Sequence, residues 1–381
     1  MKKHAYSLLY GAAILFFISL IGSKYDSHYG FSELAGFGSQ WEHSRLSELS
    51  ALNYFVKANS GGYDGQFYAQ IAFDPSLQNP ELPQVLDSPA YRSRRIFLPA
   101  FAYLVGGGNP SIILQAYCTL NIIAWIAFGF ILLHWLPPGS LFNFSKWLTC
   151  MLSLGVLESI RYSLTDLPSV VLMLSAILCM EKKRGLLAGL SQLLALFTKE
   201  TSILNLIALS VFPKKGWNPL REKQNQWTLG IGFISFLSFA LWLFYINHVF
   251  APSINAAGNI GLPFVGLFNG ISSALAEISS GTVSTRFVFR LITAAGLSFQ
   301  FLYLITHRSY QNPIWKWGMS FACLYVTFGE YIWWGHWATS RVALPMTIAF
   351  CILYHPRNPK WQYWGVFAAN LSLIHGIIRW I

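Results

Sequence analysis

The sequence predicts an all-α, polytopic membrane protein with about eleven membrane-spanning helices. Three observations predict this fold class. Of the 381 residues, 54% are hydrophobic and only 11% are charged, against about 25% charged residues in a typical soluble domain. Apolar runs recur along almost the whole chain. Basic residues gather in the short segments between alternate runs, as they do in cytoplasmic loops of membrane proteins.

The first apolar run follows Lys2 and Lys3 and extends to about Ile21. It is longer than the apolar region of a signal peptide, and no small-residue cleavage pattern follows it. We therefore interpret 1–22 as an uncleaved first span with its basic, N-terminal end in the cytoplasm.

A long outer segment, 23–110, comes next and contains two short helix-like pieces, 47–56 and 96–105. The second piece would be roughly 15 Å long as a helix, about half the thickness of the hydrocarbon layer. We expect it to lie in the interface or to re-enter the membrane, without crossing it.

The rest of the chain, 111–381, is expected to form the helical bundle of the same single membrane domain. The expected spans are about 111–136, 145–160, 167–180, 186–197, 201–213, 227–249, 285–306, 315–331, 342–355 and 361–379. With these spans every basic loop is cytoplasmic and the C-terminus is outside, provided that 96–106 does not cross. The short spans 186–197 and 201–213 suit a hairpin that borders an outward-facing cavity.

Composition argues against several other classes. The net charge of +11 comes from 26 Lys and Arg against 15 Asp and Glu, and the topology explains it, so we expect no nucleic-acid partner. The five cysteines lie in apolar segments without paired spacing. They predict neither a disulfide framework nor a thiolate metal site.

The same topology places a set of polar residues on the outer side. Ionisable groups at membrane depth are costly, so each is treated as a functional hypothesis. The candidates are Tyr63, Asp64, Tyr68, Arg92, Arg94, Arg95, Asp166, Lys199, Glu200, His336 and Arg341.

Asp64 is the candidate general base, because a carboxylate can accept a hydroxyl proton. Gly65 would let the backbone approach a ligand, and the rings of Tyr63 and Tyr68 suit a sugar face or a lipid headgroup. The alternative is a local turn, since Asp-Gly is a common turn pair. For Asp74, which precedes a proline, we favour the turn.

The basic candidates suit a phosphate, which guanidinium groups bind in bidentate fashion. Arg92, Arg94 and Arg95 could equally anchor the chain at the interface. Arg341 is a plausible phosphate ligand at the start of a late span.

The remaining candidates each have a simpler explanation. Helix capping alone accounts for Asp166, and Lys199 and Glu200 could neutralise each other, although Lys199 could equally hold a phosphate. The tryptophans around His336 are typical of an aromatic belt, but His336 itself is less easily explained that way.

Taken in order, three stretches resemble the GT-C class of membrane glycosyltransferases, which use polyprenyl- or dolichyl-phosphate-linked sugars. The stretches are 63–68 (YDGQFY), 161–166 (RYSLTD) followed by 181–185 and 198–201, and 340–345 (SRVALP). Many members carry a second acidic residue in the first loop, whereas Gly65 and Gln66 follow Asp64 here. This departure favours a base over a scheme with two carboxylates or a bridging metal.

The resemblance implies that Asp64 deprotonates an acceptor hydroxyl, which displaces polyprenyl phosphate from the sugar with inversion. Arg341, Lys199 and the Arg92–Arg95 cluster would stabilise the departing phosphate. The implied partners are the polyprenyl-phosphate sugar, the lipid bilayer and an acceptor glycan, lipid or protein. We expect no metal site and no cofactor, and a divalent cation is possible but not required. The expected location is a cell membrane, by preference a prokaryotic inner membrane.

Three other functions are open. A transporter or flippase for lipid-linked glycans would favour inverted repeats and polar residues near the bilayer midplane. A non-catalytic assembly subunit would tolerate Asp64→Asn. An acyltransferase is a weaker alternative, because His336 is isolated and belongs to no acyl-transfer motif.

Overall fold

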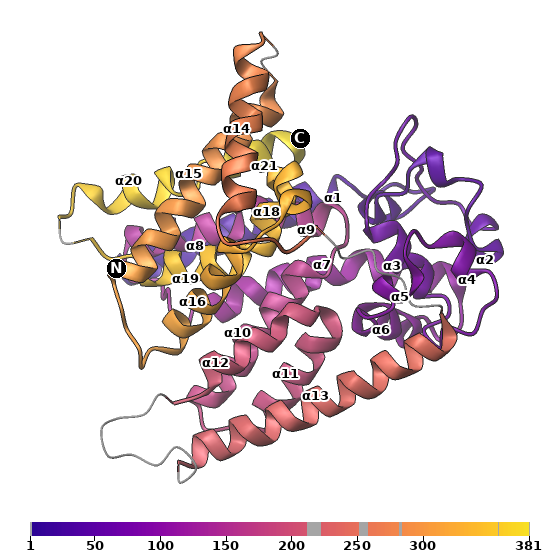
Figure 1. Cartoon of the computed structure of the whole chain (residues 1–381), viewed down its shortest axis with the longest axis horizontal. Coiled ribbons are helices and arrows are strands. Elements are labelled where there is room, and N and C mark those ends of the chain that lie inside the picture. The colour runs from indigo at the N-terminus through magenta and orange to yellow at the C-terminus, as the bar shows by residue number, and fades with distance from the viewer. Residues whose placement is uncertain (1, 212–221, 251–257, 282–283, 357, 381) are drawn as a thin grey trace.

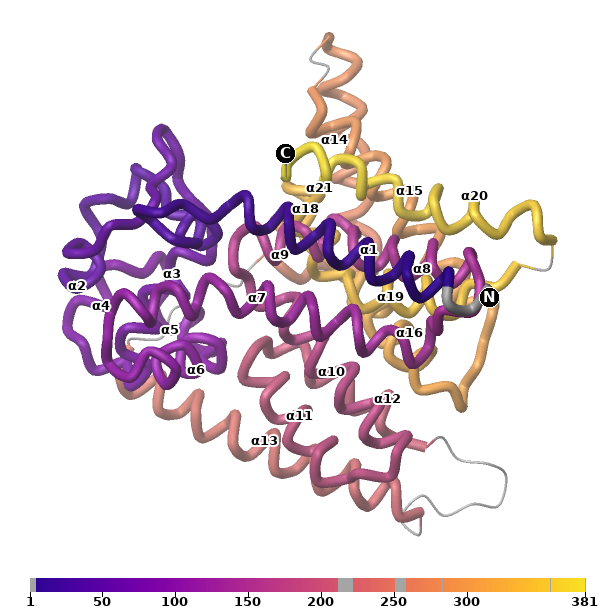
Figure 2. The backbone as a smooth tube through the Cα atoms, turned by 180° about the vertical axis from the view of Figure 1, so that it is seen from behind, coloured from indigo at the N-terminus to yellow at the C-terminus, as the bar shows by residue number. Residues whose placement is uncertain are grey.

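The expectation of an all-α chain is confirmed by a computed structural model, which describes residues 2–211, 222–250, 258–281, 284–356 and 358–380 (Figure 1). Within these ranges the regular elements are all helices, and β-structure is limited to isolated bridges. The helices belong to one body, with the outer segment at the end opposite the N-terminus (Figures 1 and 2).

Among the described residues, four helices are long and apolar enough to cross a membrane. They are α1 (Lys2–Gly22), α7 (Pro110–Leu132), α13 (Lys223–Val249) and α15 (Thr285–Thr306). A fifth span is possible if α9 (Leu154–Arg161) and α10 (Asp166–Glu181), which meet at a bend of 119°, count as one. These helices are compatible with a membrane protein, and the count of eleven spans stays a prediction.

The other expected spans are shorter or broken. The elements there are α8 (Leu141–Met151), α11 (Gly185–Thr198), η3 (Glu200–Asn205), α12 (Leu206–Leu209), α16 (Pro313–Val326), α17 (Glu330–Trp334), α18 (His336–Val342), α19 (Leu344–Leu353), α20 (Trp361–Ala368) and α21 (Leu373–Trp380). Glycine explains one of the breaks: Gly329 and Gly335 flank α17 in extended conformations, and glycine is a poor helix former. The expected end of one span, 212–213, lies outside the described residues.

The outer segment folds into short helices that pack together at one end of the bundle (Figure 1). They are η1 (Ser32–Ala35), η2 (Ser39–Trp41), α2 (Ser47–Ser50), α3 (Gly65–Ile71), α4 (Leu82–Val85), α5 (Pro89–Arg92) and α6 (Phe97–Gly106). The expected helix over 47–56 is thus helical only at its start. The ten residues of α6 are too few to cross about 30 Å of hydrocarbon. Gly107 ends this helix in the left-handed conformation (φ 56°).

The long helix α13 holds the outer segment against the bundle. The indole nitrogen of Trp242 donates to the carbonyl of Ser93 at 3.0 Å, and the hydroxyl of Tyr245 donates to the carbonyl of Ser76 at 2.5 Å. Both acceptors lie far from α13 in sequence, so these bonds hold the outer segment against the C-terminal part of this helix.

Gly65 lets the start of α3 approach the bundle closely. A Cβ atom built at this position would lie 1.9 Å from the carbonyl oxygen of Tyr162 and 2.8 Å from that of Ala35. The backbone at Gly65 is therefore packed closely against two other backbone segments of the protein. The sequence predicts that this glycine lets the backbone approach a ligand, but the structure shows the approach of other backbone atoms in its place.

We expect Gly65→Ala to lower the free energy of unfolding by about 1–3 kcal/mol, because the added methyl group must push two backbone segments apart. Gly230→Ala is the matched control, since a Cβ at this position in α13 meets nothing within 4 Å. Thermal unfolding of the two purified variants in the same detergent measures the difference. Equal midpoints would contradict the close packing at Gly65.

Candidate functional site

Asp64 lies at the first turn of α3, and its side chain turns toward Arg92. The backbone of Asp64 and Gly65 does form a turn, closed by the backbone nitrogen of Gln66 donating to the carbonyl of Tyr63 at 3.1 Å, but the Asp64 side chain makes no capping hydrogen bond. Its Oδ1 accepts from Nη2 of Arg92 at 2.9 Å. Arg92 also donates to Asp87, from Nε at 2.8 Å and from Nη2 at 2.6 Å. The Asp64 side chain is 32% exposed, which leaves its carboxylate within reach of solvent.

The surroundings of Asp64 keep its carboxylate charged. Burial raises the pKa of this group, but the guanidinium groups of Arg92 and Arg341 lower it by more, and the net pKa lies below the usual value. Asp64 is therefore ionised at neutral pH and can accept a hydrogen bond or a proton from a hydroxyl group.

Tyr68 and Arg95 extend the network from Asp64 toward the bundle. The Tyr68 hydroxyl accepts from Arg95 at 2.8 Å and from Arg92 at 3.4 Å. Burial raises the pKa of Tyr68 to about 12, so the phenol stays neutral. Arg95 forms a two-point ion pair with Glu200, at 3.0 and 2.7 Å, and also donates to Tyr91 at 2.8 Å.

Asp166 is the centre of a second cluster. Its Oδ1 accepts from the ammonium group of Lys199, and its Oδ2 accepts from Nη1 of Arg341 at 3.3 Å. Helix capping therefore does not account for Asp166, which binds one cation between α11 and η3 and another on α18. Lys199 and Glu200 do not neutralise each other either, since Lys199 binds Asp166 and Glu200 binds Arg95.

Tyr63 joins the two clusters. The guanidinium carbon of Arg341 lies 5.1 Å from the centre of the Tyr63 ring, and that ring stacks on Tyr162 with centroids 4.4 Å apart. The Nε atom of Arg341 is buried and has no hydrogen-bond partner. Its side chain is 10% exposed, so a buried donor next to Tyr63 is left for another acceptor.

The network has opposite excess charge at its two ends. At Arg92, one cation faces the two carboxylates Asp64 and Asp87. At Asp166, one carboxylate faces the two cations Lys199 and Arg341. The Arg95–Glu200 pair is neutral. The site thus presents a carboxylate-rich side and a cation-rich side, with Tyr63 between them.

Two of the sequence-predicted residues stand apart from this network. Arg94 contacts the Tyr91 ring at 5.7 Å and has no ion pair among the described residues. His336 is fully buried, and its Nε2 lies 2.7 Å from Nδ1 of His375. The other candidates, Tyr63, Asp64, Tyr68, Arg92, Arg95, Asp166, Lys199, Glu200 and Arg341, all belong to the network.

Sequence reasoning missed several contributors. Asp87 gave no local signal, because its partner Arg92 is recognised only in the structure, and Tyr162, although part of the stretch 161–166, was given no role of its own. Glu158, which is 1% exposed and pairs with Arg379 at 2.9 Å, could have been found as a carboxylate inside an apolar run.

The turn at Asp74 is confirmed, since its carboxylate accepts from the backbone nitrogens of Gln78 and Asn79 at 2.7 and 2.6 Å.

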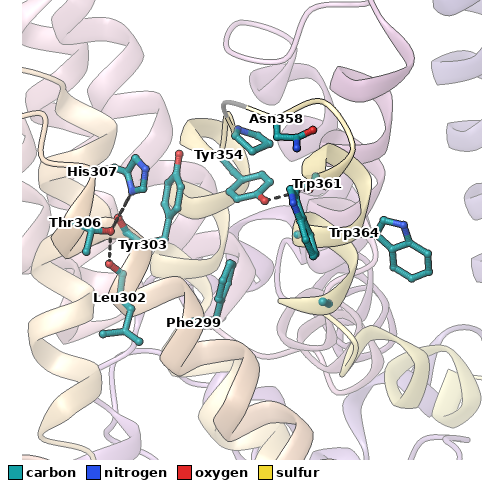
Figure 3. Close-up of a pocket in the computed structure, with 12 residues that line it drawn as sticks. Phe299, Leu302, Tyr303, Thr306, His307, Tyr354, Asn358, Trp361 and Trp364 are labelled. Carbon is teal, nitrogen blue, oxygen red and sulfur yellow. Dashed lines mark hydrogen bonds between the residues drawn. The ribbon is translucent and has the colours of Figure 1, made fainter.

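A cavity of about 690 Å³ lies elsewhere, between α15 and α20 (Figure 3). Aromatic rings line much of it, including the stacked pair Tyr303 and His307, whose centroids are 4.1 Å apart. Tyr354 donates to the carbonyl of Trp361 at 3.1 Å. None of the sequence-predicted site residues lines this cavity, and its apolar walls suit hydrocarbon better than a charged reaction.

No protein-family model matches the chain, and neither a curated protein nor a solved structure does. The resemblance to the GT-C class therefore rests on the sequence motifs. Within the described ranges, no three His, Cys, Asp or Glu side chains are grouped closely enough to hold a metal ion.

Proposed function

We propose that the chain is a membrane glycosyltransferase of the GT-C type, which moves a sugar from a polyprenyl-phosphate donor to an acceptor hydroxyl. The observation that carries this proposal is the charge separation around Tyr63. An ionised, partly exposed Asp64 lies on one side, and the cation-rich cluster of Lys199 and Arg341 lies on the other. A base and a phosphate site are the two parts that this transfer needs.

In the proposed step, the acceptor oxygen forms a bond to the anomeric carbon while the bond from that carbon to the phosphate oxygen breaks. The acceptor proton passes to the Asp64 carboxylate, and the electron pair of the broken bond leaves with polyprenyl phosphate. Because attack and departure occur on opposite faces of the sugar, the anomeric configuration inverts. Asp64 then returns its proton to solvent through its exposed edge.

Arg341 and Lys199 would stabilise the phosphate as its negative charge grows. Arg341 is the better candidate, because its Nε is unpartnered and its bond to Asp166 is long at 3.3 Å. Preorganised donors of this kind act most strongly where water is excluded. Arg95 is fully engaged by Glu200 and two tyrosines, so we assign it a positioning role. The geometry gives Arg94 and His336 no part in the step.

The proposed topology puts this site at the outer face of a cell membrane, with the N-terminus in the cytoplasm. The network lies where the outer segment meets the bundle, at the end remote from the N-terminus (Figure 2). A prokaryotic inner membrane is the proposed location.

The direct test is release of polyprenyl phosphate by the purified chain in proteoliposomes. Several polyprenyl-phosphate sugars are supplied with a mixture of glycan, lipid and peptide acceptors, with and without divalent cations. Release that depends on the chain supports the proposal. A folded chain that releases nothing from any donor, yet moves a lipid-linked glycan between leaflets, would replace it with the transporter. A folded chain with neither activity would favour the assembly subunit.

The ion pair between Arg92 and Asp64 predicts how activity depends on pH. Arg92 lowers the pKa of Asp64, so Arg92→Gln must raise that pKa. The base would then be protonated, and inactive, at a higher pH than in the wild type. We expect the acid limb of the kcat/KM profile to move to higher pH in Arg92→Gln and to stay in place in Arg94→Gln. Identical acid limbs in all three proteins would remove Asp64 as the titrating base.

A further inference from the structure

A second cationic site lies beside the helical hairpin formed by α14 (Val265–Ser279) and α15. A cavity of about 350 Å³ opens there between α14, α15 and α17. Its lining includes the side chains of Arg290, Trp333 and Trp334. None of its lining residues belongs to the Asp64 network. Figure 1 shows this hairpin projecting from the body of the molecule.

Arg290 lines this cavity, and Arg286, one turn earlier on α15, binds the same carbonyl of the lining residue Trp334. Nη2 of Arg286 and Nη2 of Arg290 both donate to the carbonyl oxygen of Trp334, at 2.7 and 2.6 Å. Arg290 also donates to the hydroxyl of Ser273 at 3.0 Å, and it is only 4% exposed. Neither arginine forms an ion pair in the described parts of the chain, although like charges one turn apart on a helix repel each other.

The unsatisfied groups around the cavity are all donors. Nε of Arg286, Nε of Arg290 and Nε1 of Trp333 are buried without a hydrogen-bond partner. The one carboxylate in the lining, Glu330, accepts from the amide of Asn269 at 2.5 Å. Buried donors without acceptors are costly. Among the described residues, no carboxylate lies within ion-pair distance of either arginine, so an anionic ligand could accept from their free donors.

We propose that this cavity binds a phosphate group. Guanidinium groups match phosphate oxygens in bidentate geometry, and basic pockets between membrane helices bind lipid headgroups. The volume exceeds that of a phosphate ion alone and accommodates a phosphate with an attached glycerol or sugar ring. Trp334 is 68% exposed, and its ring carries the guanidinium group of Arg286, whose carbon lies 4.4 Å from the ring centre. This proposal does not depend on the glycosyltransferase activity proposed above.

Anchoring at the membrane interface explains the positions of Arg286 and Arg290 less well than phosphate binding does. An anchoring arginine extends its charge toward water, whereas Arg290 is buried and points to Ser273 and the Trp334 carbonyl. The first two turns of α15 are also the end of that helix remote from its basic following loop at His307 and Arg308. Membrane topology accounts for basic residues at the cytoplasmic end of a span, and so does not account for arginines at the opposite end of α15 as well.

The test measures phosphate binding by the purified full-length chain. One arm titrates inorganic phosphate and records thermal stabilisation in detergent. The other arm compares retention of phosphatidylglycerol with that of phosphatidylcholine by native mass spectrometry after extraction from mixed vesicles. We expect binding in at least one arm, and a roughly tenfold or larger loss of affinity in Arg286→Gln and in Arg290→Gln. Saturation by inorganic phosphate with equal retention of both lipids identifies free phosphate, whereas preferential retention of phosphatidylglycerol identifies a headgroup.

Arg308→Gln is the matched control, because this exposed arginine follows the other end of α15 and bonds to its sequence neighbours Ile305 and Tyr310. Arg286→Gln guards against a folding artefact, since Arg286 is only half-buried. Affinity that falls equally in Arg308→Gln would overturn the proposal, as would a wild-type chain that binds neither probe. Unchanged affinity in a folded Arg286→Gln, Arg290→Gln double variant would also overturn it.

Discussion

Asp64→Asn is expected to lower the rate of sugar transfer by a factor of about 10²–10⁴, the usual contribution of a general base. Asparagine keeps the shape of the side chain but cannot accept the acceptor proton. Arg92 keeps its two bonds to Asp87, so the outer segment retains its anchor. The measurement is the rate of polyprenyl phosphate release at matched amounts of folded protein.

Asp87→Asn is the matched control for this loss. It removes the same charge from the same arginine, but Asp87 is not the proposed base. We expect it to reduce transfer by no more than about tenfold, the effect of a weakened positioning contact (about 1.4 kcal/mol). Equal losses in the two variants would show that only the charge balance at Arg92 matters, and Asp64 would lose its assignment as base.

Arg341→Gln is the second large effect, with an expected fall in kcat of about 10²–10³, comparable to the loss of one preorganised donor in an oxyanion site. The loss falls on kcat because the phosphate gains negative charge as its bond to the sugar breaks. Asp166 keeps Lys199 as its partner, so the variant does not leave a buried carboxylate unpaired. Steady-state kinetics over a range of donor concentrations separate kcat from KM.

Arg94→Gln provides the comparison for Arg341→Gln. Both variants remove one positive charge, but Arg94 lies by the Tyr91 ring and is not part of the cation-rich cluster. We expect its kcat to stay within about twofold of the wild type, as for a surface change within about ±0.5 kcal/mol. If Arg341→Gln behaved like Arg94→Gln, the phosphate would have to bind elsewhere, and Lys199 would be the next residue to test.

The polar motifs marked the right parts of the chain, but they did not reveal which side chains pair. Sequence reasoning identified Asp166 and Lys199 as separate features, a helix cap and half of a local pair. They bind each other across 33 residues, and Arg341 joins them from 175 residues away. Pairings over such distances follow from the packing of several helices and leave no local pattern.

The sequence by itself determined that the chain is all-helical, with helices long and apolar enough to cross a membrane. An excess of apolar residues and long apolar runs require helices that satisfy their own backbone hydrogen bonds, and the structure is accordingly helical. The tertiary structure decided how the helices break and how the charges are arranged around Tyr63. The physical reason is that hydrophobicity acts residue by residue along the chain, whereas a buried ion pair exists only when packing brings its two partners together.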